Sequence, residues 1–415
     1  MSRRAATGRA WRQVRRLALH VLVPAVGAAA PLAVIPAVTS TAGATGWAAI
    51  AVGLSVGVAA AVVAELGWSI VGPQRVVREP DDRRRLYATA LASRLVATAV
   101  TAPVAVVVTA VVVDGHRLAA VLVTVGVAFG ALSPTWFFVG LGRPAAVLLA
   151  ETLPRVLTSV ASAMAIAAGA PLEAYGAGAI VAVAASLVLA GVLDEAPGLP
   201  RRVDFASVPA TLRAQRVLVL GRAVTTTYKS LPSALLGGVA PSAAVAGFAA
   251  VDRPLRMGLQ VVSAVPDRLQ TWVGHPSPDL ARRRSLWSLA LNGVLGVVVG
   301  VVFAVAMPTV ARLLFTGVVE VPPSLAVWGG VLAGVICASR GAGLALVSAG
   351  RPGRTTLAAF CSAAVGVPAL LLFGASHGAA GALAALVAAE AVGLIVQLVA
   401  VGRGAHRPRS RVVTP

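Results

Sequence analysis

The chain is built from apolar runs that are close to, or longer than, the roughly 20 residues with which a helix crosses a bilayer. Of its 415 residues, 58% are hydrophobic and only 12% are charged. A soluble globular protein needs far more polar surface than this composition supplies. The runs therefore predict an all-α integral membrane protein.

Twelve of these runs are long enough to be membrane-spanning helices, and short connections join most of them. The first run follows a basic N-terminus, but it is long, contains three prolines and lacks a clear cleavage site. These features favour a retained helix over a removed signal peptide. The approximate bounds of the predicted spans are residues 17–37, 47–71, 88–113, 118–140, 145–169, 175–193, 215–238, 242–272, 285–307, 324–348, 356–375 and 378–401.

The arginines in the connections predict which side of the membrane each connection faces. If the N-terminus is cytoplasmic, 25 arginines in the termini, the connections and the ends of the spans fall on the cytoplasmic side, and only Arg117 and Arg312 fall on the other. Cytoplasmic loops of membrane proteins carry such an excess of basic residues. We therefore expect an even number of spans in the cell membrane, with both termini in the cytoplasm.

This distribution also explains the formal net charge of +20. A nucleic-acid-binding protein would gather its basic residues on one face of a soluble domain. The cysteines Cys337 and Cys361 and the five histidines lack the spacing of a disulfide framework or a metal site. The chain has no Walker motif and no catalytic constellation on a soluble domain. We therefore expect a protein that is not an enzyme and that uses no cofactor, metal or nucleic acid.

Short matches between the two halves of the chain indicate an internal repeat. Gly142-Arg143-Pro144 follows the fourth run and Gly350-Arg351-Pro352 follows the tenth, 208 residues later. Gly46-Trp47 opens the second run and Gly247-Phe248 lies early in the eighth, 201 residues later. Both halves start on the same side, so the repeat is parallel, with a pseudo-two-fold axis along the membrane normal.

We therefore predict two six-helix lobes. The predicted divisions are a cytoplasmic arginine-rich N-terminus over residues 1–16, an N-lobe over 17–193, a cytoplasmic linker over 194–214, a C-lobe over 215–401 and a basic cytoplasmic tail over 402–415.

Eight basic side chains lie inside the apolar runs, where each would cost about 2.5–3.5 kcal/mol at the centre of a lipid-exposed helix. Such a cost is tolerated where the cations face a shared, wetted interior. A cationic interior in a membrane protein indicates an anionic cargo. The eight residues are Arg94, Arg155, Arg222, Lys229, Arg253, Arg256, Arg268 and Arg340.

The seventh span carries the clearest polar stripe. Arg222, Thr225, Thr226 and Lys229 fall at i, i+3, i+4 and i+7, which places them on one helix face. Arginine presents a planar fork to phosphate oxygens, whereas lysine acts as a point charge. We interpret the stripe as a cavity lining that meets a pyrophosphate and a sugar; the alternative is pairing with acids on neighbouring helices.

Two further spans carry an acid and an arginine four residues apart, a spacing at which side chains on a helix meet. Asp252 and Arg256 predict an intrahelical ion pair, and Arg253 is expected to point elsewhere. Glu151 and Arg155 have the same spacing. That second pair is either a structural ion pair whose charges neutralise each other, or it dissociates when an anion binds the arginine.

The remaining charged positions inside the spans leave two interpretations open. Arg94 lies about two turns inside the third span and is expected to face the lobe interior or the cavity. Glu65 and Glu390 have no basic neighbour in their own helices, so each could couple transport to protons or sodium, or form half of an interhelical pair. We also count Glu151 and Asp252 among the candidates for ion coupling.

Two short stretches resemble a known family. The segment from Ser133 to Pro144, SPTWFFVGLGRP, is similar to the tryptophan-aromatic-x-Gly turn after the fourth helix in the polysaccharide-flippase branch of the multidrug/oligosaccharidyl-lipid/polysaccharide (MOP) exporter superfamily. Many members have glutamine where this chain has Val139, and an acidic residue near Gly142. Ala246 to Ala249, followed by Asp252-Arg253-Pro254, resembles the opening of the family's eighth helix.

The resemblance implies the fold of the multidrug exporters in that superfamily and a flippase that works by alternating access. Its cargo would be an undecaprenyl-pyrophosphate-linked oligosaccharide, moved from the inner to the outer leaflet for cell-surface polysaccharide synthesis. Glycan polymerases or glycosyltransferases are implied partners. The cavity cations carried over onto this sequence are Arg222, Lys229, Arg94, Arg155 and Arg256.

Three other functions compete with this one. They are an ion-coupled multidrug exporter of the same fold, a flippase for a peptidoglycan precursor, and a membrane scaffold for glycan assembly. A multidrug exporter usually carries cations and needs an acidic cavity, whereas about five acids stand against the eight cations inside these spans.

Overall fold

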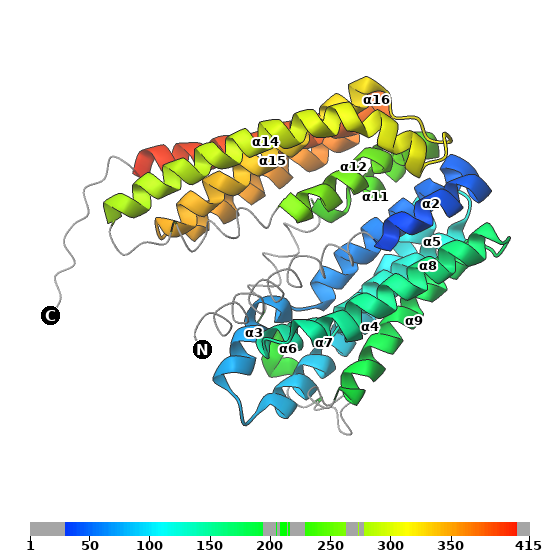
Figure 1. Cartoon of the computed structure of the whole chain (residues 1–415), viewed down its shortest axis with the longest axis horizontal. Coiled ribbons are helices and arrows are strands. Elements are labelled where there is room, and N and C mark those ends of the chain that lie inside the picture. Colours follow the sequence, from blue (N-terminus) through cyan, green and yellow to red (C-terminus); the bar gives the residue numbers. More distant parts are fainter. Residues whose placement is uncertain are drawn as a thin grey trace, which may run out of the picture. The chain divides into compact units, whose positions relative to one another are not determined.

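The computed structural model describes residues 30–193, 208–213, 229–262 and 278–404, together with residues 205, 215 and 273. All the regular secondary structure in these ranges is helical (Figure 1). Eight helical segments of this described part are long and apolar enough to cross a membrane. The prediction of an all-α membrane protein is confirmed, whereas the count of twelve spans and the internal repeat remain predictions.

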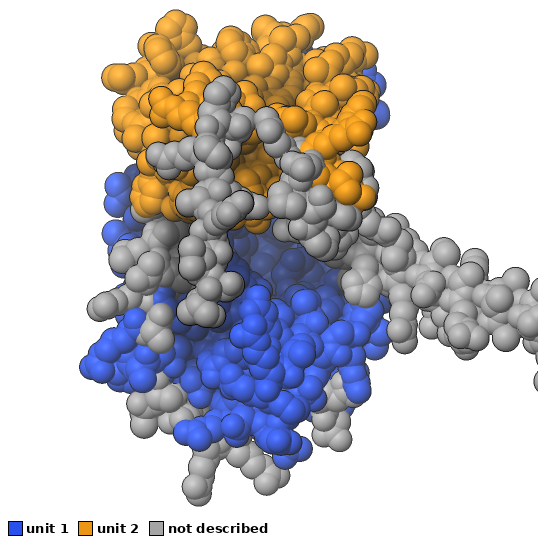
Figure 2. All heavy atoms as spheres, turned by 90° about the vertical axis from the view of Figure 1, so that its left-hand side faces the viewer, with its two compact units in different colours: residues 1–261, 309–321 blue, residues 262–308, 322–415 orange. Residues whose placement is uncertain are grey.

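The chain divides into two compact units, which Figure 2 shows in different colours. Unit 1 comprises residues 1–261 and 309–321, and unit 2 comprises residues 262–308 and 322–415. The predicted lobe boundaries at 193 and 215 fall in or beside stretches outside the described residues, so they also remain predictions.

The first nine helical segments all belong to unit 1. They are η1 (Ala30–Ala33), α2 (Val34–Ala64), α3 (Trp68–Arg78), α4 (Arg83–Val112), α5 (Arg117–Ala128), η2 (Phe129–Leu132), α6 (Thr135–Gly140), α7 (Pro144–Val147) and η3 (Leu148–Thr152). They are followed by α8 (Leu153–Ala167), α9 (Glu173–Val192), α11 (Pro232–Gly237) and α12 (Ser242–Val262). Unit 2 is built from α14 (Pro278–Leu314), α15 (Pro323–Ser348) and α16 (Pro352–Gly404), although the last residues of α14 group with unit 1.

Two of the long helices are interrupted at a glycine. Gly43 in α2 has φ 64° and Gly378 in α16 has φ 57°, a backbone conformation that side chains disfavour and glycine adopts freely. Each break falls where the sequence predicts that one span ends and the next begins. The third to sixth predicted spans coincide with the segments Arg83–Val112, Arg117–Gly140, Pro144–Ala167 and Glu173–Val192.

Small residues set the helix packing inside unit 1. α2 packs against α4, α5 and α8, and α9 packs against both α5 and α8. A Cβ added to Gly57 would meet Val127 of α5 at 2.8 Å, and one added to Gly126 would meet Ala179 of α9 at 2.7 Å. Such close approach is how membrane helices gain van der Waals contact where lipid supplies no hydrophobic drive.

An aromatic cluster fixes one end of unit 1, where the turn Ser133–Pro144 lies. Trp136 packs against Trp68 with ring centroids 5.4 Å apart and stacks on Tyr87 at 6.2 Å. Gly72 of α3 lies against the Trp136 indole with no room for a side chain. The aromatic residues of this turn therefore hold α3, α4 and α6 together.

Unit 2 has its own tight interface. Gly296 and Gly300 on α14 face Gly334 and Gly330 on α15, so the two backbones touch. This is the small-xxx-small pattern of membrane helix pairs, present on both partners.

The two Gly-Arg-Pro turns have matching geometry. Gly142 and Gly350 have φ 67° and 72°. The N–H of Arg143 donates to the carbonyl of Phe138 at 3.0 Å, and the N–H of Arg351 donates to that of Leu346 at 2.9 Å. Both are the six-residue bonds that close a helix C-terminus with glycine in the left-handed conformation.

Candidate functional site

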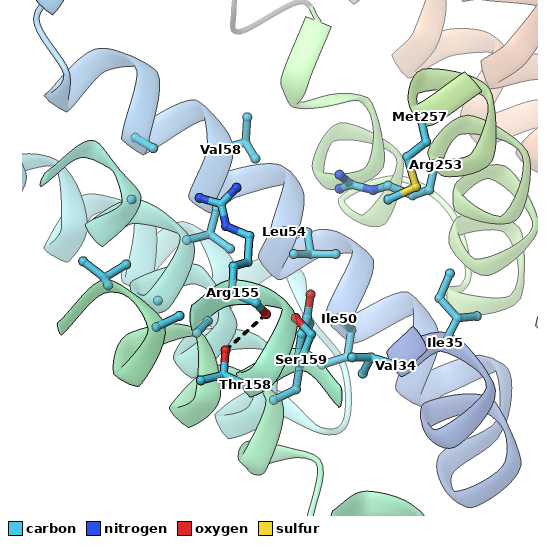
Figure 3. Close-up of a pocket in the computed structure, with 18 of the residues that line it drawn as sticks. Val34, Ile35, Ile50, Leu54, Val58, Arg155, Thr158, Ser159, Arg253 and Met257 are labelled. Atoms are coloured by element: carbon cyan, nitrogen blue, oxygen red, sulfur yellow. Dashed lines mark hydrogen bonds between the residues drawn. The ribbon is translucent and has the colours of Figure 1, made fainter. Parts of the chain in front are cut away.

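A cavity of about 510 Å³ lies within unit 1 (Figure 3). Its apolar wall is one face of α2, formed by Ile50, Leu54, Val58 and Val62 at successive four-residue steps. Residues of α5, α8, α9 and α12 complete the lining. The volume falls in the range of about 300–1,000 Å³ that is typical of small-ligand sites.

The charged part of the lining is mostly cationic. Arg155 of α8 and Arg253 of α12 enter the cavity from different helices, and Leu54 of α2 lies between them in Figure 3. Arg256 also lines the cavity, and Glu151 is the acid among the lining residues. With Asp252 counted as the partner of Arg256, the described residues of this site leave one cation in excess.

The predicted pair of Glu151 and Arg155 forms, and Glu151 has two further partners. Arg155 Nη2 donates to Glu151 Oε1. Glu151 Oε2 accepts hydrogen bonds from the hydroxyls of Ser133 at 2.6 Å and Ser186 at 2.9 Å. Glu151 lies on the π-helical turn η3, and its side chain is 13% exposed, whereas that of Arg155 is 47% exposed. The carboxylate is therefore held by three groups, and the arginine reaches into the cavity.

The predicted pair of Asp252 and Arg256 also forms. Arg256 Nε lies 2.8 Å from both carboxylate oxygens of Asp252, whose side chain is only 6% exposed. A buried carboxylate is costly unless it is paired. This pair should therefore dissociate less readily than the pair of Glu151 with Arg155.

The expectation that Arg253 points away from Arg256 is wrong, because both residues line the same cavity. They stand three residues apart, a spacing that shares a helix face. Arg253 Nη2 donates to the carbonyl of Ala51 in α2 at 3.2 Å. Its Nε is buried and has no hydrogen-bond partner among the described residues. Arg253 is thus a cavity cation with unused hydrogen-bonding capacity.

The two arginines that enter the cavity from different helices, Arg155 and Arg253, stand equally far from the starts of their helical segments. Arg155 stands eleven residues after Pro144, where its span begins, and Arg253 stands eleven residues after Ser242, where α12 begins. At about 1.5 Å per residue, each is roughly 16 Å from the start of its span. Because the hydrocarbon core is about 30 Å thick, this distance places Arg155 near the middle of its segment and Arg253 near the middle of the predicted eighth span. The helix α12 is not among the eight described segments that are long and apolar enough to cross a membrane, so the depth of Arg253 remains a prediction.

Arg94 lies outside this cavity. It is 1% exposed, and its guanidinium donates from Nε to the carbonyl of Ala90 at 3.1 Å and from Nη1 to those of Ala131 at 2.9 Å and Ser133 at 2.8 Å. Its Cζ lies 5.6 Å from the centroid of the Trp136 ring. Arg94 therefore holds the non-helical turn between η2 and α6 in place.

The other predicted site residues are spread over the molecule. Arg222 lies outside the described residues, and Lys229 is exposed and is not among the residues that line the cavity. Glu65 lies beside Arg94 in a second hollow of about 190 Å³ and accepts a hydrogen bond from the N–H of Ser69 at 3.0 Å. Glu390 is half-buried on α16 of unit 2. Of the predicted cations, the structure brings Arg155 and Arg256 together.

Comparison with known proteins assigns this chain a family and a fold. The profile of the family described as "Polysaccharide biosynthesis protein" matches residues 14–266. No curated protein sequence gives a significant match. The similar solved structures are membrane transporters and a flippase, and at identities of 9–14% they show the fold alone.

Three of these structures cover nearly the whole chain. An inward-facing multidrug resistance MATE family transporter of the MOP superfamily has a TM-score of 0.68 and 14% identity, over 95% of this chain and 99% of that one. The lipid II flippase MurJ, in an inward closed conformation, has a TM-score of 0.65 and 9% identity, over 94% and 87%. A MATE protein in a bent conformation has a TM-score of 0.55 and 14% identity, over 93% and 94%.

Proposed function

The chain belongs to the polysaccharide biosynthesis protein family and has the fold of MOP-superfamily transporters, and from this we propose that it flips a lipid-linked oligosaccharide across the cell membrane. The proposed cargo is an oligosaccharide on undecaprenyl pyrophosphate, moved from the inner to the outer leaflet for cell-surface polysaccharide synthesis. Its family and its fold neighbours are transporters and flippases rather than enzymes.

The observation that carries the proposal is the cationic cavity, which the predicted spans place near the middle of the membrane. Arg155, Arg253 and Arg256 line it, and among the described residues Arg253 is bonded to a backbone carbonyl and to no carboxylate. An arginine fork binds phosphate oxygens through two parallel hydrogen bonds, and such charge-assisted bonds are about twice as strong as neutral ones. Substrate sites of this class of transporter lie near the bilayer midplane.

The two ion pairs suggest an order in which the arginines bind the pyrophosphate. Arg253 is the first ligand, because it bonds to a neutral backbone carbonyl and not to a carboxylate, and its buried Nε has no partner among the described residues. Arg155 is the second, because Glu151 keeps the hydroxyls of Ser133 and Ser186 when the arginine leaves. Arg256 stays with Asp252, since both carboxylate oxygens depend on it. The apolar face of α2 lies beside the sugar and prenyl chain.

The proposed transport cycle is alternating access of two lobes, with both termini in the cytoplasm. Glycan polymerases or glycosyltransferases, which act before or after the flipping step, are the proposed partners. Ion coupling through Glu65, Glu151, Asp252 or Glu390 stays a prediction. The dependence of flipping on a proton or sodium gradient would test it.

An ion-coupled multidrug exporter is the second candidate, favoured by the likeness to the MATE transporter. A cationic drug would have to approach a cavity with an excess of arginine, where like charges repel. A peptidoglycan-precursor flippase is a third candidate, favoured by the likeness to the lipid II flippase. It shares the diphosphate chemistry of the first proposal and differs in the glycan.

The test is mass spectrometry of the lipid fraction after depletion of the protein from its own host. We expect an undecaprenyl-pyrophosphate oligosaccharide to accumulate, and wild type but not Arg253→Ala to reverse this. Arg84→Ala, an exposed arginine on α4, serves as the matched control and should behave as wild type. An unchanged lipid profile with new sensitivity to toxic cations would favour the exporter, and accumulation of the peptidoglycan precursor would favour the third candidate.

A further inference from the structure

A second basic cavity, of about 1230 Å³, lies in unit 2, where the start and the end of α16 meet. Arg351 directly precedes the helix, Arg354 lies in its first turn and Arg403 lies in its last turn. Arg351 Nη1 donates to the carbonyl of Ala400 at 3.4 Å, which links the two ends. The described residues that line it include three arginines and no acid, which gives them a formal charge of +3.

The rest of this cavity is an apolar surface that continues into the span. Leu357, Ile395 and Val399 line it, with exposures of 45%, 59% and 45%. Leu357 stands about one turn after Arg354, and Val399 and Ile395 stand about one and two turns before Arg403. Moving from the arginines into the span, the surface therefore changes from cationic to aliphatic within two turns.

The matching turn in unit 1 shows that Arg354 is not required for this local fold. The two Gly-Arg-Pro turns make equivalent hydrogen bonds at Arg143 and Arg351. The residue 208 positions before Arg354 is Ala146, which follows the turn in unit 1 without a charge. The extra cation therefore has a role beyond closing the turn.

We infer that this cavity binds an anionic phospholipid of the cytoplasmic leaflet. The phosphodiester would contact Arg354 and Arg403, with Arg351 behind them, and the acyl chains would lie along Leu357, Ile395 and Val399. The sequence predicts this end of unit 2 to face the cytoplasm, where anionic lipid headgroups attract basic residues and basic pockets between helices hold them. The inference does not depend on which cargo the protein transports.

The test is native mass spectrometry of the full-length protein released from nanodiscs of phosphatidylcholine containing a minority of phosphatidylglycerol. We expect wild type to retain phosphatidylglycerol preferentially. Arg354→Gln/Arg403→Gln should lower the retained ratio of the two lipids roughly twentyfold, because each basic residue near an anionic surface contributes on the order of fivefold. Arg84→Gln/Arg85→Gln is the matched control, since both arginines are exposed near the start of α4, on the predicted cytoplasmic side.

Three results would overturn the inference. They are equal retention of the two lipids by wild type, an equal loss in the control, and release of phosphatidylglycerol by inorganic phosphate but not by matched chloride. The last would indicate a site for a free anion. If the double variant does not fold, Arg354→Gln alone provides the test, with an expected fall of roughly fivefold.

Discussion

Arg94 and Arg253 are both arginines inside predicted membrane spans of unit 1, yet their surroundings differ in kind. Arg94 is 1% exposed and donates to three backbone carbonyls, one of them in η2 and one at the residue that follows it. Arg253 lines the 510 Å³ cavity and donates to one carbonyl. Among the described residues each guanidinium keeps one buried nitrogen without a partner, Nη2 of Arg94 and Nε of Arg253, so the two arginines differ in the carbonyls that they hold and in the cavity that Arg253 lines. The first therefore stabilises the fold, whereas the second is available to a ligand.

The difference has a physical origin in the neighbouring backbone. Pro134 has no N–H, and the helix is interrupted at Ser133, so nearby carbonyls lack helical partners. Non-helical backbone is tolerated at membrane depth only where protein groups satisfy it, and Arg94 does so. Ala51, which accepts from Arg253, lies within the continuous part of α2, where its carbonyl already has a helical partner. An arginine in this unit is therefore structural where it donates hydrogen bonds to carbonyls that lack a helical partner.

The largest expected effect is the loss of folded protein in Arg94→Met. The change leaves the carbonyls of Ala131 and Ser133 buried without a donor, at about 1–3 kcal/mol each. Melting temperature and size-exclusion profile in detergent measure the result. Arg94→Lys should recover only part of the stability, because an ammonium group lacks the planar fork. Wild-type stability together with lost transport would instead indicate that Arg94 binds the cargo. The distinction between a structural Arg94 and a ligand-binding Arg253 would then not hold.

The next largest effect is expected in binding. Arg253→Ala should weaken the affinity for a soluble prenyl-pyrophosphate analogue by roughly tenfold to hundredfold, since a hydrogen bond to a charged group contributes about 1.5–3 kcal/mol. Its melting temperature should stay near wild type. Intrinsic fluorescence titration measures the affinity, and Arg253→Lys should retain part of it. Unchanged affinity in Arg253→Ala would remove the distinction between the two arginines.

A smaller effect should follow from Glu151→Gln, in the opposite direction. The amide cannot pair ionically with Arg155, so the arginine becomes free for the anion, and affinity should rise about two- to fivefold, in keeping with about 0.5–1 kcal/mol for a partly exposed pair. The same titration measures it. Weaker binding would mean that Glu151 positions Arg155 rather than competes for it.

Glu79→Gln is the matched control for Glu151→Gln, because it removes the acid of an exposed pair at the same spacing. Arg75 donates to Glu79 from Nε and Nη2, each at 3.0 Å, and these bonds lower the pKa of Glu79. Any stabilisation by the pair is therefore present at neutral pH and lost as the pH falls through that pKa. We expect the variant to bind the analogue and to melt as wild type does, since exposed pairs contribute little.

Much of the fold could be predicted because hydrophobic runs and turn residues act locally. The break at Gly378 falls at the predicted start of the last span, and the Gly-Arg-Pro turns end their helices as their sequence indicates. The kink at Gly43 lies between two predicted spans for the same reason. The unit division could not be predicted, because it depends on packing between helices far apart in the sequence.

The site was predictable only in part. Spacing within one helix was enough to predict the pairs of Glu151 with Arg155 and of Asp252 with Arg256. It could not reveal that Arg94 meets carbonyls 37 and 39 residues away. The ion pair of Asp252 with Arg256 does not predict the position of Arg253, whereas its i, i+3 spacing from Arg256 indicates a shared helix face. That spacing is the signal that could have found it.

The most direct test of the central claim measures flipping itself, in proteoliposomes that contain purified protein and a short-chain prenyl-pyrophosphate disaccharide with a quenchable label. The account predicts that wild type and Arg84→Ala expose the labelled lipid on the opposite leaflet at equal rates, and that Arg253→Ala, folded and inserted to the same extent, shows only the rate of protein-free vesicles. A wild-type rate in Arg253→Ala would contradict the claim that the cavity cation binds the pyrophosphate.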